Sequence, residues 1–169
     1  LQMSQADLVL FLTQDAVPTD EHLIEHMAAC FEQENVAAAY GRQLPAADCN
    51  VIETYTRAFN YPGESRIKTK ADLPKLGIKT YFCSDVCAMY RRDVYQKLGG
   101  FPRKTIFNED MIFAATVIGA GYGIMYCAEG RVIHSHNYTG AQQFHRNFDL
   151  AVSQKQHPEV FSGLRSEGE

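Results

Sequence analysis

The pattern of apolar positions opens with a short run, residues 6–12, that is rich in strand-forming side chains. The run has the length of one buried strand. It stops at Thr13, Gln14 and Asp15, and Pro18 bars a simple continuation. A carboxylate just past the carboxyl end of a buried strand lies where open α/β sheets place their ligands, and it suits a hard cation that holds a phosphate. The alternative is that Asp15 only caps the next turn.

Apolar spacing along the rest of the chain predicts alternating helices and strands. Residues 19–35 carry apolar side chains at four-residue intervals, as in an amphipathic helix. Further helices are expected at 51–59, 93–98, 108–118 and 140–156, and strands at 36–40, 86–90, 123–127 and 131–136. The segment 60–77 combines proline and glycine with many charges, so it is expected to be a long, mobile loop. The alternation predicts an α/β fold with some antiparallel strands.

Composition narrows the class of protein. A length of 169 residues suits one domain, and the tail 162–169 is expected to be disordered. No apolar run approaches membrane-spanning length. The net charge of −4, without a basic stripe, argues against a general nucleic-acid binder. The 5 cysteines form no C-x-x-C pair, and their odd number indicates free thiols in a reducing compartment.

The start of the chain is unusual for a complete protein. It begins at Leu1 without an initiator methionine and runs directly into an apolar strand. We therefore expect a piece of a longer protein in which the preceding strands are missing. The sheet edge where those strands would pair would then be exposed, which favours oligomer formation.

A second candidate site is the run Asn108-Glu109-Asp110 at the start of a predicted helix. One interpretation is structural, because Asn108 can cap the helix while the two acids complement its dipole. The other is catalytic, because a carboxylate within hydrogen-bond reach of an attacking hydroxyl can accept its proton as a general base. The residues alone leave both interpretations open.

The third candidate is His134-Ser135-His136. In a strand, alternate residues share a face, so both imidazoles would point the same way. Two histidines on one face indicate a metal ligand or a diphosphate contact, with one of the two structural.

Two other patterns in the sequence match known sites incompletely. Residues 22–26 fit H-x-x-E-H, in which His22 and His26 could share a zinc ion one helical turn apart. Their helix spends its core face on other residues, and no third ligand is evident. An aspartyl phosphatase of the haloacid dehalogenase type would need a second acid at position 17, where the chain has Val17.

Six short motifs occur in a fixed order along nearly the whole chain. They are FLTQDAVP (11–18), CAMYRR (87–92), LGGF (98–101), FNED (107–110), CAEGRVIHSHNY (127–138) and FHRNFD (144–149). Together they resemble a family-2 glycosyltransferase with the GT-A fold, and in particular the bacterial rhamnosyltransferases. The resemblance implies a mixed sheet flanked by helices. Residues 1–161 would form a partial GT-A domain that carries the metal, catalytic-base and acceptor side.

The resemblance also implies a metal site. The segment Thr13-Gln14-Asp15 corresponds to the family's D-x-D-like motif, which holds Mg²⁺ or Mn²⁺ on the diphosphate of a nucleotide sugar. Asp15 would be the acid on the metal side. Thr13 stands where the motif has its first acid, and the missing carboxylate weakens metal binding. His134, together with His136, would reach the metal or the diphosphate.

The implied reaction is sugar transfer with inversion. Of the Glu-Asp pair, Asp110 is expected to be the base that deprotonates the acceptor hydroxyl, with Glu109 as its neighbour. The segments 84–85 and 60–77 would shape the acceptor side. Likeness suggests rhamnose as the sugar and a polysaccharide or lipid-linked saccharide as the acceptor.

Free cysteines and the supply of nucleotide sugars predict a cytoplasmic location. Peripheral association with the inner face of the membrane and a homo-oligomeric state are left open. The alternative from another functional class is a non-catalytic, glycosyltransferase-like module that binds carbohydrate or protein. Thr13 and the missing donor half favour that alternative.

Overall fold

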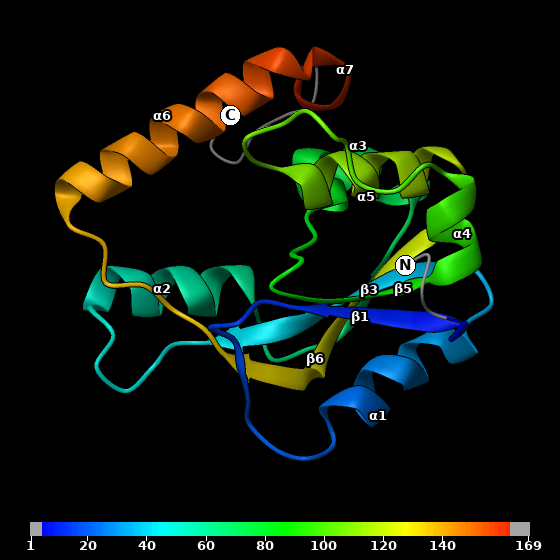
Figure 1. Cartoon of the computed structure of the whole chain (residues 1–169), viewed down its shortest axis with the longest axis horizontal. Helices are drawn as coiled ribbons and strands as arrows, with labels where there is room; N and C mark the ends of the chain where they lie inside the picture. The colour runs from blue at the N-terminus through cyan, green and yellow to red at the C-terminus, as the bar shows by residue number, and fades with distance from the viewer. Residues whose placement is uncertain (1–4, 163–169) are drawn as a thin grey trace.

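The computed structural model describes residues 5–162 as a mixed sheet with helices on both faces (Figure 1). The strands are β1 (Leu8–Leu12), β2 (Val17–Pro18), β3 (Val36–Leu44), β4 (Arg66–Lys68), β5 (Cys87–Arg91) and β6 (Gly123–Ile133). Their order across the sheet is β1-β5-β3-β6-β2, and β4 pairs with β6. The α/β class expected from the sequence is confirmed.

Helices cover the two faces of the sheet with separate apolar cores. They are α1 (Leu23–Ala29), α2 (Val51–Asn60), α3 (Leu73–Leu76), α4 (Arg92–Lys97), α5 (Glu109–Gly119), α6 (Gly140–Gln156) and α7 (Pro158–Phe161). Figure 1 shows α1 on one face of the sheet and α4 and α5 on the other. Leu23 and Met27 of α1 belong to one core, while Val94 of α4 and Phe113 of α5 belong to the other. The first helix is shorter than predicted, because the chain tightens into a 3-10 turn at Cys30–Glu32.

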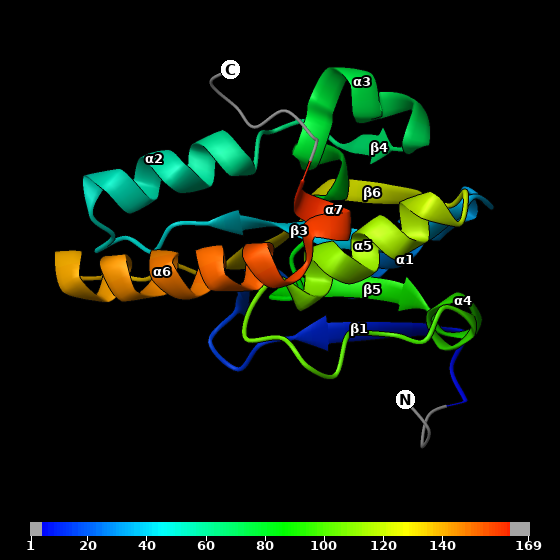
Figure 2. The same cartoon turned by 90° about the horizontal axis from the view of Figure 1, so that it is seen from above.

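Strand direction explains why distant motifs meet. Both β1 and β3 run antiparallel to β5, and β3 runs parallel to β6. The carboxyl ends of β1, β3 and β6 therefore lie at the same end of the sheet. Helices α2 and α6 extend beyond that end (Figure 2). Side chains that follow these strands are gathered there, as the rule for ligand sites in α/β sheets predicts.

The predicted strand at residues 6–12 is present as β1, but the prediction that it is buried is wrong. β1 is the edge strand of the described sheet and pairs only with β5, so its side chains are half-buried and Leu12 is exposed. Apolar composition cannot distinguish an edge strand packed on one neighbour from a central strand, because both bury one face.

The two short strands predicted at 123–127 and 131–136 are one strand, β6, which ends at Ile133. Its pairing with β3 shifts register between Gly41 and Arg42, so that Gly41 pairs with Cys127 and Arg42 with Arg131. Glycine is required at position 41, because a Cβ atom there would lie 2.5 Å from the carbonyl oxygen of Gly130. The close approach lets the strand continue through its irregularity.

The segment 60–77 is ordered, which contradicts the expectation of a mobile loop. Its β4 pairs with β6, and a 3-10 turn at Lys70–Asp72 begins with a capping box between Thr69 and Asp72. Local side-chain capping and three ladder residues are enough to fix a segment whose composition alone suggests a loop.

Three further expectations concern membrane-spanning helices, the cysteines and the carboxyl-terminal tail. In residues 5–162, no helix combines the length and apolar character needed to cross a bilayer. All five cysteines are free, and four of them are buried. The expected tail, apart from Ser162, lies outside the described residues.

Candidate active site

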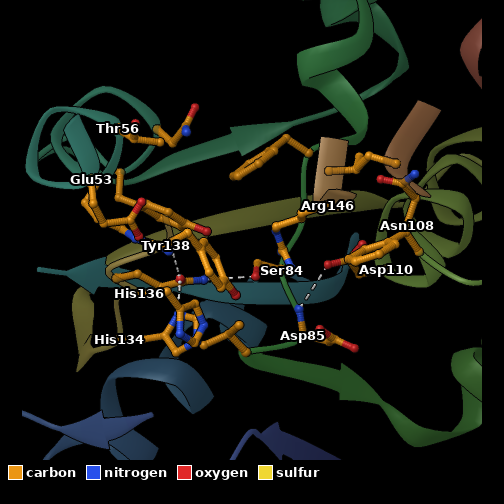
Figure 3. A pocket seen from close by; sticks show the side chains of 18 of the residues that line it. Glu53, Thr56, Ser84, Asp85, Asn108, Asp110, His134, His136, Tyr138 and Arg146 are labelled. Carbon is orange, nitrogen blue, oxygen red and sulfur yellow. Dashed lines mark hydrogen bonds and ion pairs between the residues drawn. The ribbon is translucent and has the colours of Figure 1, made fainter. Parts of the chain in front are cut away.

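A cavity of about 760 Å³ lies among α2, the start of α5, the segment after β6 and α6 (Figure 3). Its lining is polar at two places. One carries His134 and His136, and the other carries Asp85, Glu109 and Asp110. Two of the three candidates from the sequence, 108–110 and 134–136, therefore line one cavity, and Asp15 adjoins it through its contacts with the histidines.

Asp15, His134 and His136 form a cluster that could hold a metal ion. One ligand atom from each lies within 4.8 Å of the others, a grouping found once among residues 5–162. The Asp15 carboxylate is 3.4 Å from Nε2 of His134 and 3.7 Å from Nε2 of His136. β2 pairs with the end of β6, which carries the loop of Asp15 to the histidines. Both imidazoles approach the same carboxylate, although they follow the strand rather than belong to it.

Neighbouring groups tune the charges in this cluster. The Thr13 hydroxyl, helped by the nearby histidines, lowers the pKa of Asp15, so this acid is charged at neutral pH. Burial, followed by the charge of Arg57, lowers the pKa of His134, which favours a neutral imidazole. A carboxylate beside a neutral imidazole is the state in which Asp15 and His134 can bind a divalent cation. Gln14 is exposed in the turn after β1.

A buried polar network behind His134 was missed by sequence reasoning. Nδ1 of His134 lies 2.8 Å from Oε1 of Gln43, which also accepts a hydrogen bond from Arg57. Arg57 forms an ion pair with Glu53 one helical turn away, and both side chains are mostly buried. The amide of Gln43 donates to Ser84 Oγ at 2.9 Å. The one signal in the sequence is Gln43 itself, which with Arg42 interrupts the apolar residues of β3 near its carboxyl end.

The acidic side of the cavity centres on Asp110. Its Oδ1 accepts from the backbone N–H of Met111 at 2.7 Å, and its Oδ2 accepts from that of Asp85 at 3.3 Å. Burial, followed by the nearby Asp85 carboxylate, raises the pKa of Asp110 to about 7. Burial and the charge of Glu109 also raise the pKa of Asp85. A carboxylate that titrates near neutral pH is suited to proton transfer.

The capping interpretation of Asn108 is wrong. The residue occupies the N-cap position of α5, but its φ of 65° is left-handed and its side chain makes no capping hydrogen bond. Its Nδ2 is buried without a partner among the described residues. The adjacent carbonyl of Phe107 accepts from both Thr105 and Ser153, which holds the peptide before Asn108 in place.

The H-x-x-E-H pattern does not form a metal site within residues 5–162. His22 is exposed and pairs with Glu25 at 2.8 Å, inside the pattern itself. The rings of His22 and His26 are 6.2 Å apart, and the pair gains no third ligand. The helix directs Leu23 and Met27 to the core, as the apolar spacing predicts.

One further cation reaches the cavity. Arg146 of α6 lies over the ring of Tyr138, 5.7 Å from its centre (Figure 3). It also lies over the ring of Phe107, 4.9 Å from its centre. The sequence placed Arg146 within a motif but assigned it no role. Stacking on aromatic rings fixes its guanidinium plane while the charge stays accessible.

The fold of the chain is shared with a solved glycosyltransferase structure. The chain superposes on a mannosyltransferase from Pyrobaculum calidifontis, PcManGT, solved in complex with GDP-Man and Mn²⁺, with a TM-score of 0.62 at 14% sequence identity. The match covers 94% of this chain and 41% of that one. The shared architecture is that of GT-A glycosyltransferases.

The sequence then identifies the family. Residues 1–99 match the model of glycosyl transferase family 2, and the chain belongs to that family. It is 48% identical over 167 residues to the O-antigen chain rhamnosyltransferase WbaN of Salmonella anatum. It is 47% identical over 166 residues to the O-antigen chain rhamnosyltransferase RfbN of Salmonella typhimurium strain LT2. Each match covers almost all of this chain but only 53% of the relative, so the chain spans about half the length of these relatives.

Proposed function

We propose that this chain carries the metal, base and acceptor side of a glycosyltransferase that moves a sugar from a nucleotide-diphosphate donor to a saccharide acceptor. The observation that carries the proposal is the pairing of two sites around one cavity. Asp15 and His134 belong to a cluster suited to a divalent cation, while Asp110 stands on the opposite side with a pKa of about 7. Transfer needs both a charge-neutralising group at the leaving diphosphate and a base at the acceptor hydroxyl.

The residues present fit a divalent cation. Arg57 can only donate, so the Gln43 oxygen faces it, and the same oxygen faces Nδ1 of His134. A neutral His134 then directs the Nε2 lone pair at the Asp15 carboxylate, so two acceptors face each other 3.4 Å apart. The Thr13 Oγ1 nearby is buried and makes no hydrogen bond of normal geometry with a described residue. A cation between these groups would remove the repulsion.

Asp15, His134 and His136 would hold the metal, and two nitrogen ligands with one carboxylate favour Mn²⁺ over Mg²⁺. When bound, the cation supplies positive charge where negative charge develops on the leaving diphosphate. Arg146 supplies a second positive charge from the α6 side of the cavity.

Asp110 is the base in this proposal. It accepts the proton of an acceptor hydroxyl, whose oxygen then attacks the anomeric carbon from the face opposite the diphosphate. The bond from that carbon to the phosphate oxygen breaks, and the anomeric configuration inverts. The two backbone N–H groups at Asp110 orient the carboxylate, and Glu109 and Asp85 line the same side for contacts with the acceptor.

The relatives support rhamnose as the sugar and a growing O-antigen saccharide, polymeric or lipid-linked, as the acceptor. A cytoplasmic site of action, at or near the inner membrane face, follows from the need for nucleotide sugars. These assignments concern the whole protein and rest on relatives that are about twice as long as this chain.

The test is an assay of nucleotide-sugar hydrolysis and transfer across a panel of donors, with Mn²⁺, Mg²⁺ or chelator. It is run on the 169-residue chain and on any longer protein that contains it. We expect one donor to turn over with Mn²⁺, and we expect the Asp110→Asn variant to lose at least about a hundredfold of the rate. If both the 169-residue chain and the longer protein bind a donor but neither turns it over, the non-catalytic carbohydrate-binding module is favoured instead.

A further inference from the structure

Gln43 is the most deeply buried polar side chain next to the proposed metal cluster. Only 1% of its surface is exposed, and it lies near the carboxyl end of β3, the strand between β5 and β6. Its amide contacts three side chains from three different segments: Arg57 on α2, Ser84 before β5 and His134 after β6. A buried amide costs free energy unless such partners satisfy it.

The chemistry of these partners determines which way the amide points. Arg57 has only donors, so the Gln43 atom facing it is the oxygen. The amide nitrogen then faces Ser84 Oγ, which can accept. The oxygen also faces Nδ1 of His134 at 2.8 Å, so that nitrogen must carry the proton. In a neutral imidazole the remaining nitrogen, Nε2, then carries the lone pair.

We propose that Gln43 is a positioning residue that holds His134 as the Nδ1–H tautomer and thereby presents Nε2 to a divalent cation shared with Asp15. The inference rests on the proposed function. Histidines that bind metals commonly donate their second N–H to a carbonyl or carboxylate, which fixes both the ring and the tautomer. Here the acceptor is the amide oxygen of Gln43. Arg57 donates to the same oxygen and is itself held by its ion pair with Glu53.

The alternative tautomer shows why the contact matters. With the proton on Nε2, His134 would donate to the Asp15 carboxylate, whose oxygen is 3.4 Å away. That hydrogen bond would occupy both the nitrogen and the carboxylate that the cation needs. Gln43 excludes it, because Nδ1 would then lose its proton and face the amide oxygen acceptor to acceptor.

The first measurement uses the metal-free wild-type chain. Two-dimensional ¹⁵N NMR of the histidine side chains distinguishes the two tautomers, with the His134 signals assigned by their loss in His134→Ala. We expect the Nδ1–H form. A predominant Nε2–H form would overturn the proposal without relying on any variant of Gln43.

The second measurement is Mn²⁺ affinity, by calorimetry and by electron paramagnetic resonance. Gln43→Met removes the acceptor at nearly constant length, and we expect affinity to fall about 10- to 100-fold. Gln43→Glu retains an acceptor, and we expect affinity equal to or tighter than wild type. Ser84→Ala is the matched control, because it removes only the partner on the nitrogen side of the amide. Equal affinity in wild type and Gln43→Met would overturn the proposal.

The His134→Ala variant distinguishes failure of the proposed metal site from failure of the proposed positioning role of Gln43. If wild type binds Mn²⁺ and His134→Ala does not, the metal site stands and the Gln43 variants test the positioning role alone. If wild type binds no Mn²⁺, or His134→Ala binds equally well, the proposed metal site itself fails. Chemical denaturation of every variant shows whether a lost affinity reflects a lost fold.

Discussion

Asp85 acts on Asp110 in two opposite ways. Its backbone N–H donates to Oδ2 of Asp110 at 3.3 Å, which favours the charged carboxylate. Its side chain places a second negative charge nearby, which disfavours that form and, after burial, is the next cause of the raised Asp110 pKa. One residue thus helps to orient the candidate base and also helps to bring its titration close to neutral pH.

The raised pKa of Asp110, about 7 against an ordinary 3.8, has a consequence for stability. Between these values the folded chain holds a proton that the unfolded chain releases, so the free energy of unfolding falls as pH rises from about 4 to 7. Asp110→Asn lacks this titration. We expect the variant to gain about 1–3 kcal/mol relative to wild type between pH 4 and pH 8, after allowance for partial exposure. Urea unfolding at several pH values measures it, and parallel curves would contradict it.

The same titration predicts the pH dependence of transfer. Activity should fall as pH drops below about 7, because Asp110 must be a carboxylate to accept a proton. Asp85→Asn removes a like charge and should move this acidic limb of kcat/KM to lower pH, since only burial and the charge of Glu109 then raise the pKa of Asp110. Glu32→Gln, which changes an exposed acid in the 3-10 turn at Cys30–Glu32, is the control and should leave the limb in place. An unmoved limb in Asp85→Asn would exclude Asp110 as the titrating base.

The candidate residues on the two sides of the cavity could be proposed from the sequence, whereas the residue behind His134 could not. Asp15, Asp110 and His134 could be proposed as candidates from local patterns: Asp15 follows an apolar strand, Asp110 belongs to an acidic pair at the start of a predicted helix, and His134 alternates with His136. Gln43 could not, since its role depends on a pairing between β3 and β6 that no local pattern reveals. Gln43 matters because it lies behind His134, and only the register between β3 and β6 shows that the two residues are neighbours.

The errors in the fold have a common physical origin. Residues 60–77 contain loop-forming residues, yet β4 is fixed by its pairing with β6. Asparagine is a residue type typical of helix N-caps, yet Asn108 has a left-handed backbone and its side chain makes no capping hydrogen bond. In each case contacts distant in sequence override a local preference, which is the usual limit of reading propensity alone.

Thr13 tests whether the segment after β1 acts as a metal motif. Thr13→Asp would place a second carboxylate beside Asp15, and we expect Mn²⁺ affinity to rise about tenfold because affinity follows the number of charged ligands. Stability without metal should fall, since the two acids repel. Gln14→Asp is the matched control, because it adds the same charge at an exposed neighbouring position. Equal gains in both variants, measured by calorimetry, would show a general charge effect rather than a ligand at position 13.

The left-handed backbone at Asn108 makes a prediction that is independent of any ligand. Its φ of 65° is accessible to glycine but strained for alanine, so Asn108→Gly should be more stable than Asn108→Ala by about 1 kcal/mol. Both variants delete the side-chain amide and differ only in the Cβ atom, so the comparison reports the backbone preference at this position. At Gly119, in the last turn of α5 with open space around it, the order should reverse, and Gly119→Ala should stabilise by about 0.5–1 kcal/mol. Chemical denaturation of the three variants beside wild type measures both differences. An alanine at 108 as stable as the glycine would mean that α5 begins with ordinary helical geometry, and the orientation of Asp110 in the cavity would then need revision.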